Sequence, residues 1–303
     1  MIDPAAASGV QQAAPPQPLR GEATAATAVC WGATAIAAVL ALWFMATAGE
    51  AEARFISPAT LPSPAETMRA VPAVFGERRL VANTLVTLSR VCLGFGLSAA
   101  IGVPLGVLAA CFPAVRSFLT PLTIFGRNIP VAALIPLTFF FFGIGELQKV
   151  MFLFIASVAF VVSDTTAAVL EVPQRYVDTA LTLGASRLQI ILKVLVPLAA
   201  PAIANSLRLL FGIAFGYVML AEVVKLGGDT GGLGDLINVS QRRGEREPIL
   251  IVLVIIPLIA YAIDRALWWL QSDLFPHRYG GRGILPWAWQ RLRHGSRDFR
   301  EGA

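Results

Sequence analysis

Residues 171–203 read EVPQRYVDTALTLGASRLQIILKVLVPLAAPAI and interrupt a chain that otherwise consists mainly of long apolar runs. Apolar residues recur at helical spacing in this segment, for example Leu181, Leu188 and Leu195. Gly184 stands between the two halves, so the pattern predicts a helix, a glycine corner and a second helix. A bent amphipathic element of this kind on a membrane face is suited to insert a short helix into a groove on a soluble partner.

The rest of the chain is too apolar for an ordinary soluble domain. Of 303 residues, 56% are hydrophobic and only 14% are charged, whereas about a quarter of the residues in a soluble domain are charged. A run of about 20 apolar residues spans the roughly 30 Å of membrane hydrocarbon. The sequence therefore predicts an all-α polytopic membrane protein with about six transmembrane helices, at 27–48, 85–111, 117–143, 148–170, 199–224 and 249–271.

Three regions follow from this pattern. Residues 1–26 are rich in Ala, Pro and Gln and predict a disordered lead. Residues 27–271 form the transmembrane domain, with the polar interruption at 171–198, and residues 272–303 form a basic tail. A cleaved signal peptide is the alternative interpretation of the first apolar run. The loop charges differ too little between the two sides to decide the orientation.

Several kinds of chemistry are disfavoured by composition. The only histidines, His277 and His294, lie in the polar tail, and the three cysteines lie in or beside apolar stretches, so we expect no metal site. The net charge of +5 does not form one basic patch, so lipid and cytoplasmic loops explain it better than nucleic acid. No GxxxxGK[ST] loop is present to hold the phosphates of ATP.

The polar interruption resembles the EAA loop of binding-protein-dependent ABC importer permeases. Their pattern is EAA, three residues, Gly, nine residues and I-x-L-P. Here Asp178, Thr179 and Ala180 are followed by three residues, Gly184, nine residues and Val-Leu-Val-Pro197. Asp178 and Thr179 depart from the pattern but keep its charge and small size. Pro197 is expected to begin the fifth span.

The resemblance extends over roughly residues 55–275, to the nitrate, sulfonate, taurine and bicarbonate branch of these permeases. The matching stretches are LPSPAETM at 61–68, LSRVCLGFGLSAAIGVPLG at 88–106, GRNIPVAALIPLTFFFFGIGE at 126–146, TLGAS at 182–186 and AEVV at 221–224.

This family implies a type I importer fold and a permease subunit, not an enzyme, that imports a small solute, and the branch implies an anion. Its expected partners are a second copy of the chain, two cytoplasmic ATPase subunits that bind ATP and Mg, and an external or periplasmic solute-binding protein. It places the EAA loop and both termini in the cytoplasm, with the chain in the bacterial inner membrane. The residues expected to couple to the ATPase are Asp178, Ala180, Gly184, Ala185, Arg187 and Pro197.

Ionisable and polar residues inside the apolar runs are candidates for the translocation pathway, because charges at membrane depth usually face a bundle interior or a water path. The candidates are Arg127, Asn128, Asp164, Arg208 and Glu222. Arg127 either attracts an anion or extends to the headgroups, next to a helix break expected at Pro130. For Asp164 an ion pair with Arg208 or Arg127 is favoured over contact with solute.

Other features are given a structural interpretation. Glu222 fits a loop contact or gate as well as a solute contact, and Arg90, Asp264 and Arg265 are expected at helix ends or in satisfied contacts. The glycine-rich residues 227–235 are expected to form an outer turn. The alternative function is a secondary transporter without an ATPase partner, which would usually contain inverted repeats, and no repeat is evident.

Overall fold

The computed structural model describes residues 24–50, 54–224 and 231–279, and the described residues contain helices and no strand. The chain divides into two units, Met1–Pro64 and Ala65–Ala303. In the first unit, α1 (Ala25–Ala46) coincides with the first predicted span. Trp43 Nε1 donates to the carbonyl of Pro62 at 3.0 Å and ties the following loop to the end of this helix. The predicted lead lies almost entirely outside the described residues.

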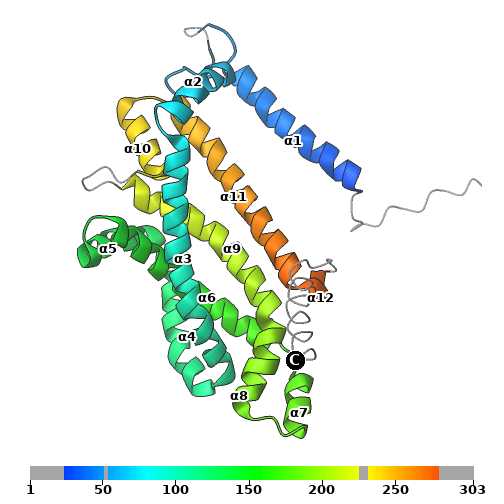
Figure 1. The fold of residues 1–303 in the computed structure, drawn as a ribbon. Coiled ribbons are helices and arrows are strands. Elements are labelled where there is room, and N and C mark those ends of the chain that lie inside the picture. The colour runs from blue at the N-terminus through cyan, green and yellow to red at the C-terminus, as the bar shows by residue number, and fades with distance from the viewer. Residues whose placement is uncertain (1–23, 51–53, 225–230, 280–303) are drawn as a thin grey trace, which may run out of the picture. The chain divides into compact units, whose positions relative to one another are not determined.

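The second unit is built from helices of very different lengths (Figure 1). Their bounds are α2 (Pro64–Gly76), α3 (Leu80–Cys111), α4 (Pro113–Asn128), the 3-10 turn η1 (Val131–Ala133), α5 (Leu134–Phe142), α6 (Glu146–Leu170), α7 (Gln174–Thr182), α8 (Arg187–Ile190), the π-helical turn η2 (Ile191–Leu195), α9 (Val196–Val223), α10 (Leu233–Arg243), α11 (Glu247–Leu274) and α12 (Pro276–Tyr279). In Figure 1, α10 lies at one end of this unit and α7 at the other, here called the α10 end and the α7 end.

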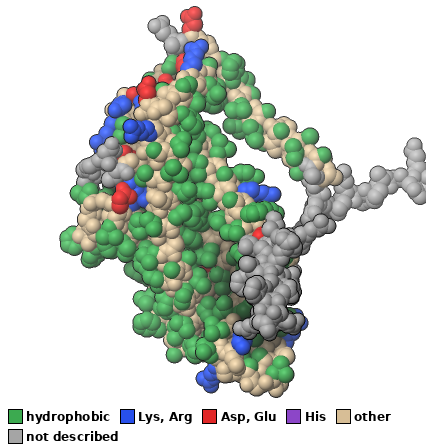
Figure 2. Space-filling model, in the orientation of Figure 1, with side chains coloured by type: hydrophobic (Ala, Val, Ile, Leu, Met, Phe, Trp, Pro, Cys, Tyr) green, Lys and Arg blue, Asp and Glu red, His purple; other side chains and the backbone are tan. Residues whose placement is uncertain are grey.

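Five helices among the described residues are long and apolar enough to cross a membrane, or six crossings if the bent pair of α4 with η1 and α5 counts as one. Hydrophobic side chains cover most of the face seen in Figure 2, and most of its charged side chains lie toward the two ends. The predicted all-α membrane fold is confirmed. The predicted span over 117–143 consists of two helices with a 91° bend between α4 and the following segment, in agreement with the helix break expected at Pro130. Pro130 lies in this break, as expected for a residue that cannot continue a helical ladder.

The closest helix pair, α3 with α6, is held together by small residues one turn apart. A Cβ atom at Gly94 would lie 2.7 Å from the carbonyl oxygen of Val150, and one at Gly106 would lie 2.8 Å from that of Val162. Between them, Ser98 Oγ donates to the carbonyl of Phe154 at 3.1 Å. Such positions let two backbones approach in the manner common to membrane helices. Because contact positions increase together along both helices, α3 and α6 run parallel.

Two apolar clusters fill the interior of this unit. The larger one lies toward the α10 end and includes Phe95, Phe152 and Phe215. The smaller one joins α3, α6 and α9 near the α7 end. At the same end, the carbonyl of Pro201 accepts a hydrogen bond from Gln271 Nε2 at 3.1 Å, which fastens α9 to α11.

The connection between α9 and α11 differs from the predicted outer turn. The glycine-rich residues 227–235 do not form only a turn, because α10 begins at Leu233; residues 225–230 lie outside the described part. The tail predicted to begin at 272 also begins later, since α11 continues to Leu274 and is followed by α12. Residues 280–303 lie outside the described residues.

The close approach of α3 and α6 generates a test with a matched control. Gly94→Ala places a methyl group 2.6 Å from Leu153 Cβ, whereas Gly96→Ala, half a turn away, meets nothing within 4 Å. We expect Gly94→Ala to destabilise the detergent-purified protein by about 1–3 kcal/mol, seen as a lower Tm, and Gly96→Ala to leave Tm unchanged or slightly higher. Equal melting of the two variants would show that α3 and α6 are not in this contact.

Candidate functional site

The predicted coupling segment folds as a helix, a corner and a second helix. At the end of α7, Gly184 N donates to the carbonyl of Leu181 at 2.9 Å, and Ala185 N donates to that of Ala180 at 3.0 Å. This pair of bonds ends a helix with a left-handed residue, and Gly184 has φ +77°. Ser186 then begins α8 with a reciprocal cap, since its Oγ accepts from Gln189 N and its own N donates to Gln189 Oε1.

The coupling residues predicted from sequence gather at this corner, with one exception. Asp178 lies in α7, where its Oδ1 accepts from Gln174 Nε2 at 3.0 Å, and Arg187 is the first residue of α8. Pro197 lies farther along, at the start of α9. The expectation that Pro197 begins a span is only partly right, because helical backbone is continuous from Arg187 to Val223. The π-helical turn η2 lies immediately before this proline, whose ring disfavours regular α-helical bonding to the preceding turn.

The segment presents apolar side chains that are not buried against the rest of the described residues. No residue of α7 is buried. Leu181, Leu188 and Leu192 are exposed, and Leu183 beside the corner is 82% exposed. A contiguous exposed apolar surface at the polar end of a membrane protein indicates a contact surface for a partner. Its position at the α7 end is visible in Figure 1.

Arg127 and Asn128, the first pathway candidates, lie in the last turn of α4, immediately before the bend. Arg127 Nη1 donates to Ser163 Oγ of α6 at 2.6 Å, and its guanidinium carbon lies 5.2 Å from the centre of the Phe160 ring. This distance permits a cation–π contact. Asn128 donates back to the carbonyl of Ile124 at 2.7 Å. Both side chains are exposed in the single chain.

Asp164 lies next to Ser163 and lines a polar cavity of about 520 Å³ between α6 and α9, whose wall also includes Arg278 of α12. Asn205, Ser206 and Glu171 share this lining. The predicted pairing of Asp164 with Arg208 is wrong, because Arg208 Nε lies 3.4 Å from Asp264 Oδ1 instead. Its alternative partner, Arg127, donates to Ser163. Arg208 and Asp264 therefore form a structural pair between α9 and α11, in agreement with the expectation of a satisfied contact for Asp264.

Glu222 belongs to a buried ion network at the α10 end, away from the other candidates. Its Oε1 accepts from Arg90 Nη1 at 2.6 Å, and Thr87 Oγ1 lies 2.9 Å from its carboxylate oxygens. Arg90 also donates to both carboxylate oxygens of Glu146, at 2.6 and 2.5 Å. The Arg90 side chain is 1% exposed and that of Glu222 is fully buried. One arginine thereby joins α3, α6 and α9.

The backbone that follows α9 forms hydrogen bonds with this network. Arg90 Nη1 donates to the carbonyl of Gly231 at 2.9 Å, and Gly234 N donates to Glu222 Oε2 at 2.9 Å. A Cβ atom at Gly232 would lie 2.5 Å from Glu222 Cδ, so no larger residue fits there. Arg90 lies in a satisfied contact, one of the two placements expected from the sequence, but the ion network itself was not predicted. A lone arginine within an apolar run was the available signal; its partners lie too far along the chain to be recognised from spacing.

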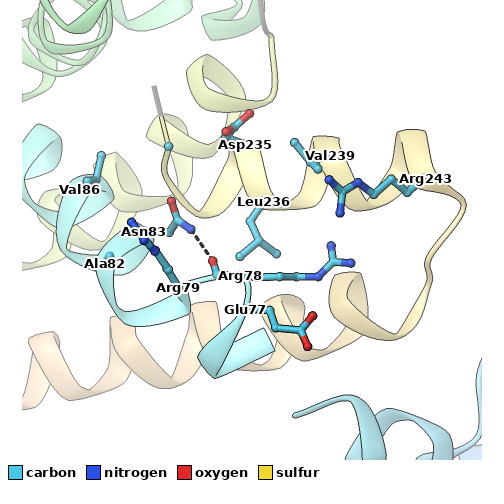
Figure 3. Close-up of a pocket in the computed structure, with 11 residues that line it drawn as sticks. Glu77, Arg78, Arg79, Ala82, Asn83, Val86, Asp235, Leu236, Val239 and Arg243 are labelled. Atoms are coloured by element: carbon cyan, nitrogen blue, oxygen red, sulfur yellow. Dashed lines mark hydrogen bonds between the residues drawn. The ribbon is translucent and has the colours of Figure 1, made fainter. Parts of the chain in front are cut away.

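A second hollow opens beside this network. A recess of about 540 Å³ is lined by the α2–α3 turn, the start of α3 and α10, and its lining includes Arg78, Arg79 and Arg243 (Figure 3). Arg78 is fixed to α10 through Ser240 Oγ at 2.9 Å and through an ion pair with Glu245. Arg79 has φ +48°, a conformation that few non-glycine residues adopt. Arg79 and Arg243 are both exposed.

The ion network generates a test of stability. Arg90→Gln leaves the Glu222 carboxylate buried without its cation, so we expect a loss of about 3–5 kcal/mol in the free energy of unfolding. The double variant Arg90→Gln/Glu222→Gln removes both charges and should regain part of that loss. Tm values of the single and double variants in detergent measure the coupling. Strictly additive losses would contradict a direct interaction.

Comparisons with known proteins agree with this architecture. Residues 102–274 match the family described as the binding-protein-dependent transport system inner membrane component. A putative ABC transporter permease protein of Methanocaldococcus jannaschii is 33% identical over 205 residues, covering 68% of this chain and 76% of the relative. The taurine transport system permease protein of Escherichia coli is 29% identical over 246 residues, covering 80% and 87%. A bicarbonate transport system permease protein of Synechococcus elongatus is 28% identical over 195 residues, covering 64% and 69%.

Solved structures share the fold. The inward-facing MetNI methionine ABC transporter matches with a TM-score of 0.58 at 24% identity, over 64% of this chain and 94% of that chain. An amino acid ABC transporter matches with a TM-score of 0.58 at 17% identity, over 67% and 97%. With the family match over more than half of its length, the chain belongs to the binding-protein-dependent transport system inner membrane components and is a permease subunit of an ABC importer.

Proposed function

We propose that this permease imports a small solute with an anionic group, driven by ATPase subunits on separate chains. The observation that carries the proposal is the bent α7–α8 segment. Its leucines Leu181, Leu183 and Leu188 are exposed and would pack against a partner surface. The taurine and bicarbonate relatives support the solute class. Arg127 supports it as well, since an exposed arginine at membrane depth suits an anion.

In this proposal, movement of the ATPase subunits is transmitted to the membrane helices through one continuous helix. The corner around Gly184 enters a groove on the ATPase, and Asp178 and Arg187 supply polar contacts at its rim. Movement of the ATPase subunits then displaces α8, which continues through η2 into α9 without a break. This is a rigid-body transfer of the kind that drives alternating access. ATP and Mg²⁺ belong to the partner, because this chain has no phosphate-binding loop.

The proposed assembly contains two copies of this chain and two ATPase subunits. Helix α4 supports the second copy, since none of its residues is buried and Phe118, Leu122 and Phe125 are exposed along it. In this assembly the α7 end and both termini lie in the cytoplasm, and the α10 end faces outward. The pathway then runs beside α4, where Arg127 and Asn128 lie.

The recess at the α10 end is the proposed contact for the external solute-binding protein. Arg79 and Arg243 are exposed cations on its lining, and Figure 3 shows Arg78 and Arg243 extending from the α2–α3 turn and from α10. Exposed arginines suit recognition of carboxylates on a partner surface. The fixed Arg78 holds the two walls of the recess together through Glu245.

The coupling proposal is tested by co-purification of tagged permease with its ATPase, followed by an ATPase assay. Gly184→Asp adds a charge and a side chain at the corner, so we expect the ATPase to be lost while the permease stays in the membrane. Gly244→Asp is the matched control, because Gly244 also has a left-handed φ, +74°, with open space around it, but lies at the α10 end. Retention of the ATPase by Gly184→Asp, or transport without any ATPase, would contradict the proposal.

The docking proposal predicts a charge effect at the opposite end. Arg243→Glu reverses a cation of the recess, so we expect stimulation of ATPase activity by the binding protein to fall severalfold, with basal activity unchanged. Arg242→Glu makes the same charge change on a neighbouring exposed residue outside the lining and should have a smaller effect. Equal effects of the two variants would indicate general electrostatic attraction without a site in the recess.

A further inference from the structure

A chain of hydrogen bonds leads from the wall of the recess at the α10 end to the buried ion network. It begins at Asn83, which lines the recess and is partly buried. Asn83 Nδ2 donates to the carbonyl of Arg78 at 2.9 Å, as Figure 3 shows, and its Oδ1 accepts from Gly232 N at 2.8 Å. One side chain therefore joins the α2–α3 turn to the segment 231–234, where α10 begins.

The segment 231–234 is fastened through its backbone to side chains of α3 and α9. The carbonyl of its first residue accepts from Arg90, and the amides of the next three donate to Asn83, Thr87 and Glu222, at 2.8 to 2.9 Å. Buried backbone groups are costly to leave unpaired. A displacement of this segment at Asn83 is therefore felt at the other three partners as well.

The partners on α3 lie along one face of the helix and lead inward from the recess. Asn83, Thr87 and Arg90 follow one another at spacings of four and three residues, which places them on one side of the helix. Asn83 is partly exposed, whereas Thr87 is 0% and Arg90 is 1% exposed. The next residue on this face is Gly94, where α3 packs against Val150 of α6. The face thus connects the recess with the closest helix contact of the unit.

We propose that Asn83 is a positioning residue that transmits docking of the solute-binding protein to the Arg90 network, an inference that rests on the proposed function of the recess. A carboxylate of the binding protein, attracted by the exposed arginines of the recess, accepts from Asn83 Nδ2 in place of the Arg78 carbonyl. Turning the amide toward the partner withdraws Oδ1 from Gly232 and releases the segment 231–234. Without docking, the intact chain of bonds holds α3, α6 and α9 together at the α10 end and keeps ATPase activity low.

The experiment compares basal ATPase activity of the purified permease–ATPase complex with the activity stimulated by its solute-loaded binding protein. Asn83→Leu keeps a side chain of similar size and removes both of its hydrogen bonds. We expect basal activity to rise about fivefold toward the stimulated level, because loss of one buried hydrogen bond shifts a two-state equilibrium by roughly that factor. The stimulated-to-basal ratio falls accordingly. A merely structural defect lowers activity and does not raise it.

A second variant breaks the chain of bonds below the recess and has a matched control. Thr87→Val removes the hydroxyl that holds Leu233 N, and Thr87 does not line the recess. We expect the same rise in basal activity, with no loss of affinity for the binding protein. Thr84→Val makes the same substitution one turn away, where the hydroxyl donates only to the carbonyl of Leu80 within α3, and should leave both quantities unchanged. Arg243→Glu should show the reverse pattern, with weaker affinity and unchanged basal activity.

The outcomes separate this inference from the proposed function. Basal activity that stays at or below the wild-type level in Asn83→Leu and Thr87→Val, or an equal rise in Thr84→Val, would overturn the role of Asn83. Loss of the ATPase from both variants would also overturn it, since the bonds would then be needed only for folding. A wild-type complex that does not bind the binding protein, or a wild-type chain that retains no ATPase, would instead overturn the proposed function.

Discussion

Burial of the Arg90 guanidinium is the constraint on which the rest of the second unit depends. An unpaired charge in that position would cost several kilocalories per mole, so Glu146 and Glu222 must both reach it, and they do so at 2.5 to 2.6 Å. These carboxylates come from α6 and α9, while Arg90 comes from α3. The positions of three membrane helices are therefore linked at the α10 end by one side chain, and the backbone around Gly231 and Gly234 closes over it.

The parallel packing of α3 against α6 is a second constraint, because it limits how the chain can connect the two helices. Two neighbouring helices that run the same way need a connection that returns across the membrane. Helix α4 begins the return along α6, and the 91° bend before α5 completes it without a straight helix. The bend also positions Arg127 at the end of α4, against Ser163. A polar site beside the bend thus follows from how the chain makes its return.

The sequence predicted the elements better than their contacts. Apolar runs set five of the long helices, and the helix, glycine and helix order of 171–198 was confirmed because Gly184 and its caps act locally. Arg90 and Glu222 could not be paired, since 132 residues separate them. α10 was missed because its polar composition resembles a loop. Asp164 was expected to pair with Arg208 or Arg127, and this failed because spacing along helices does not reveal which faces meet. The roles of the coupling and pathway residues stay predictions.

The length of the helix that follows the corner has a mechanical consequence. From Arg187 to Val223 it contains 37 residues, or roughly 55 Å at 1.5 Å per residue, against a hydrocarbon thickness of about 30 Å. It must therefore tilt or extend beyond the hydrocarbon core. The hydrogen bond from Gln271 to Pro201 holds it at an internal point. Because Glu222 also fixes its far end to Arg90, a push near Arg187 would be carried along this helix to α3 and α6.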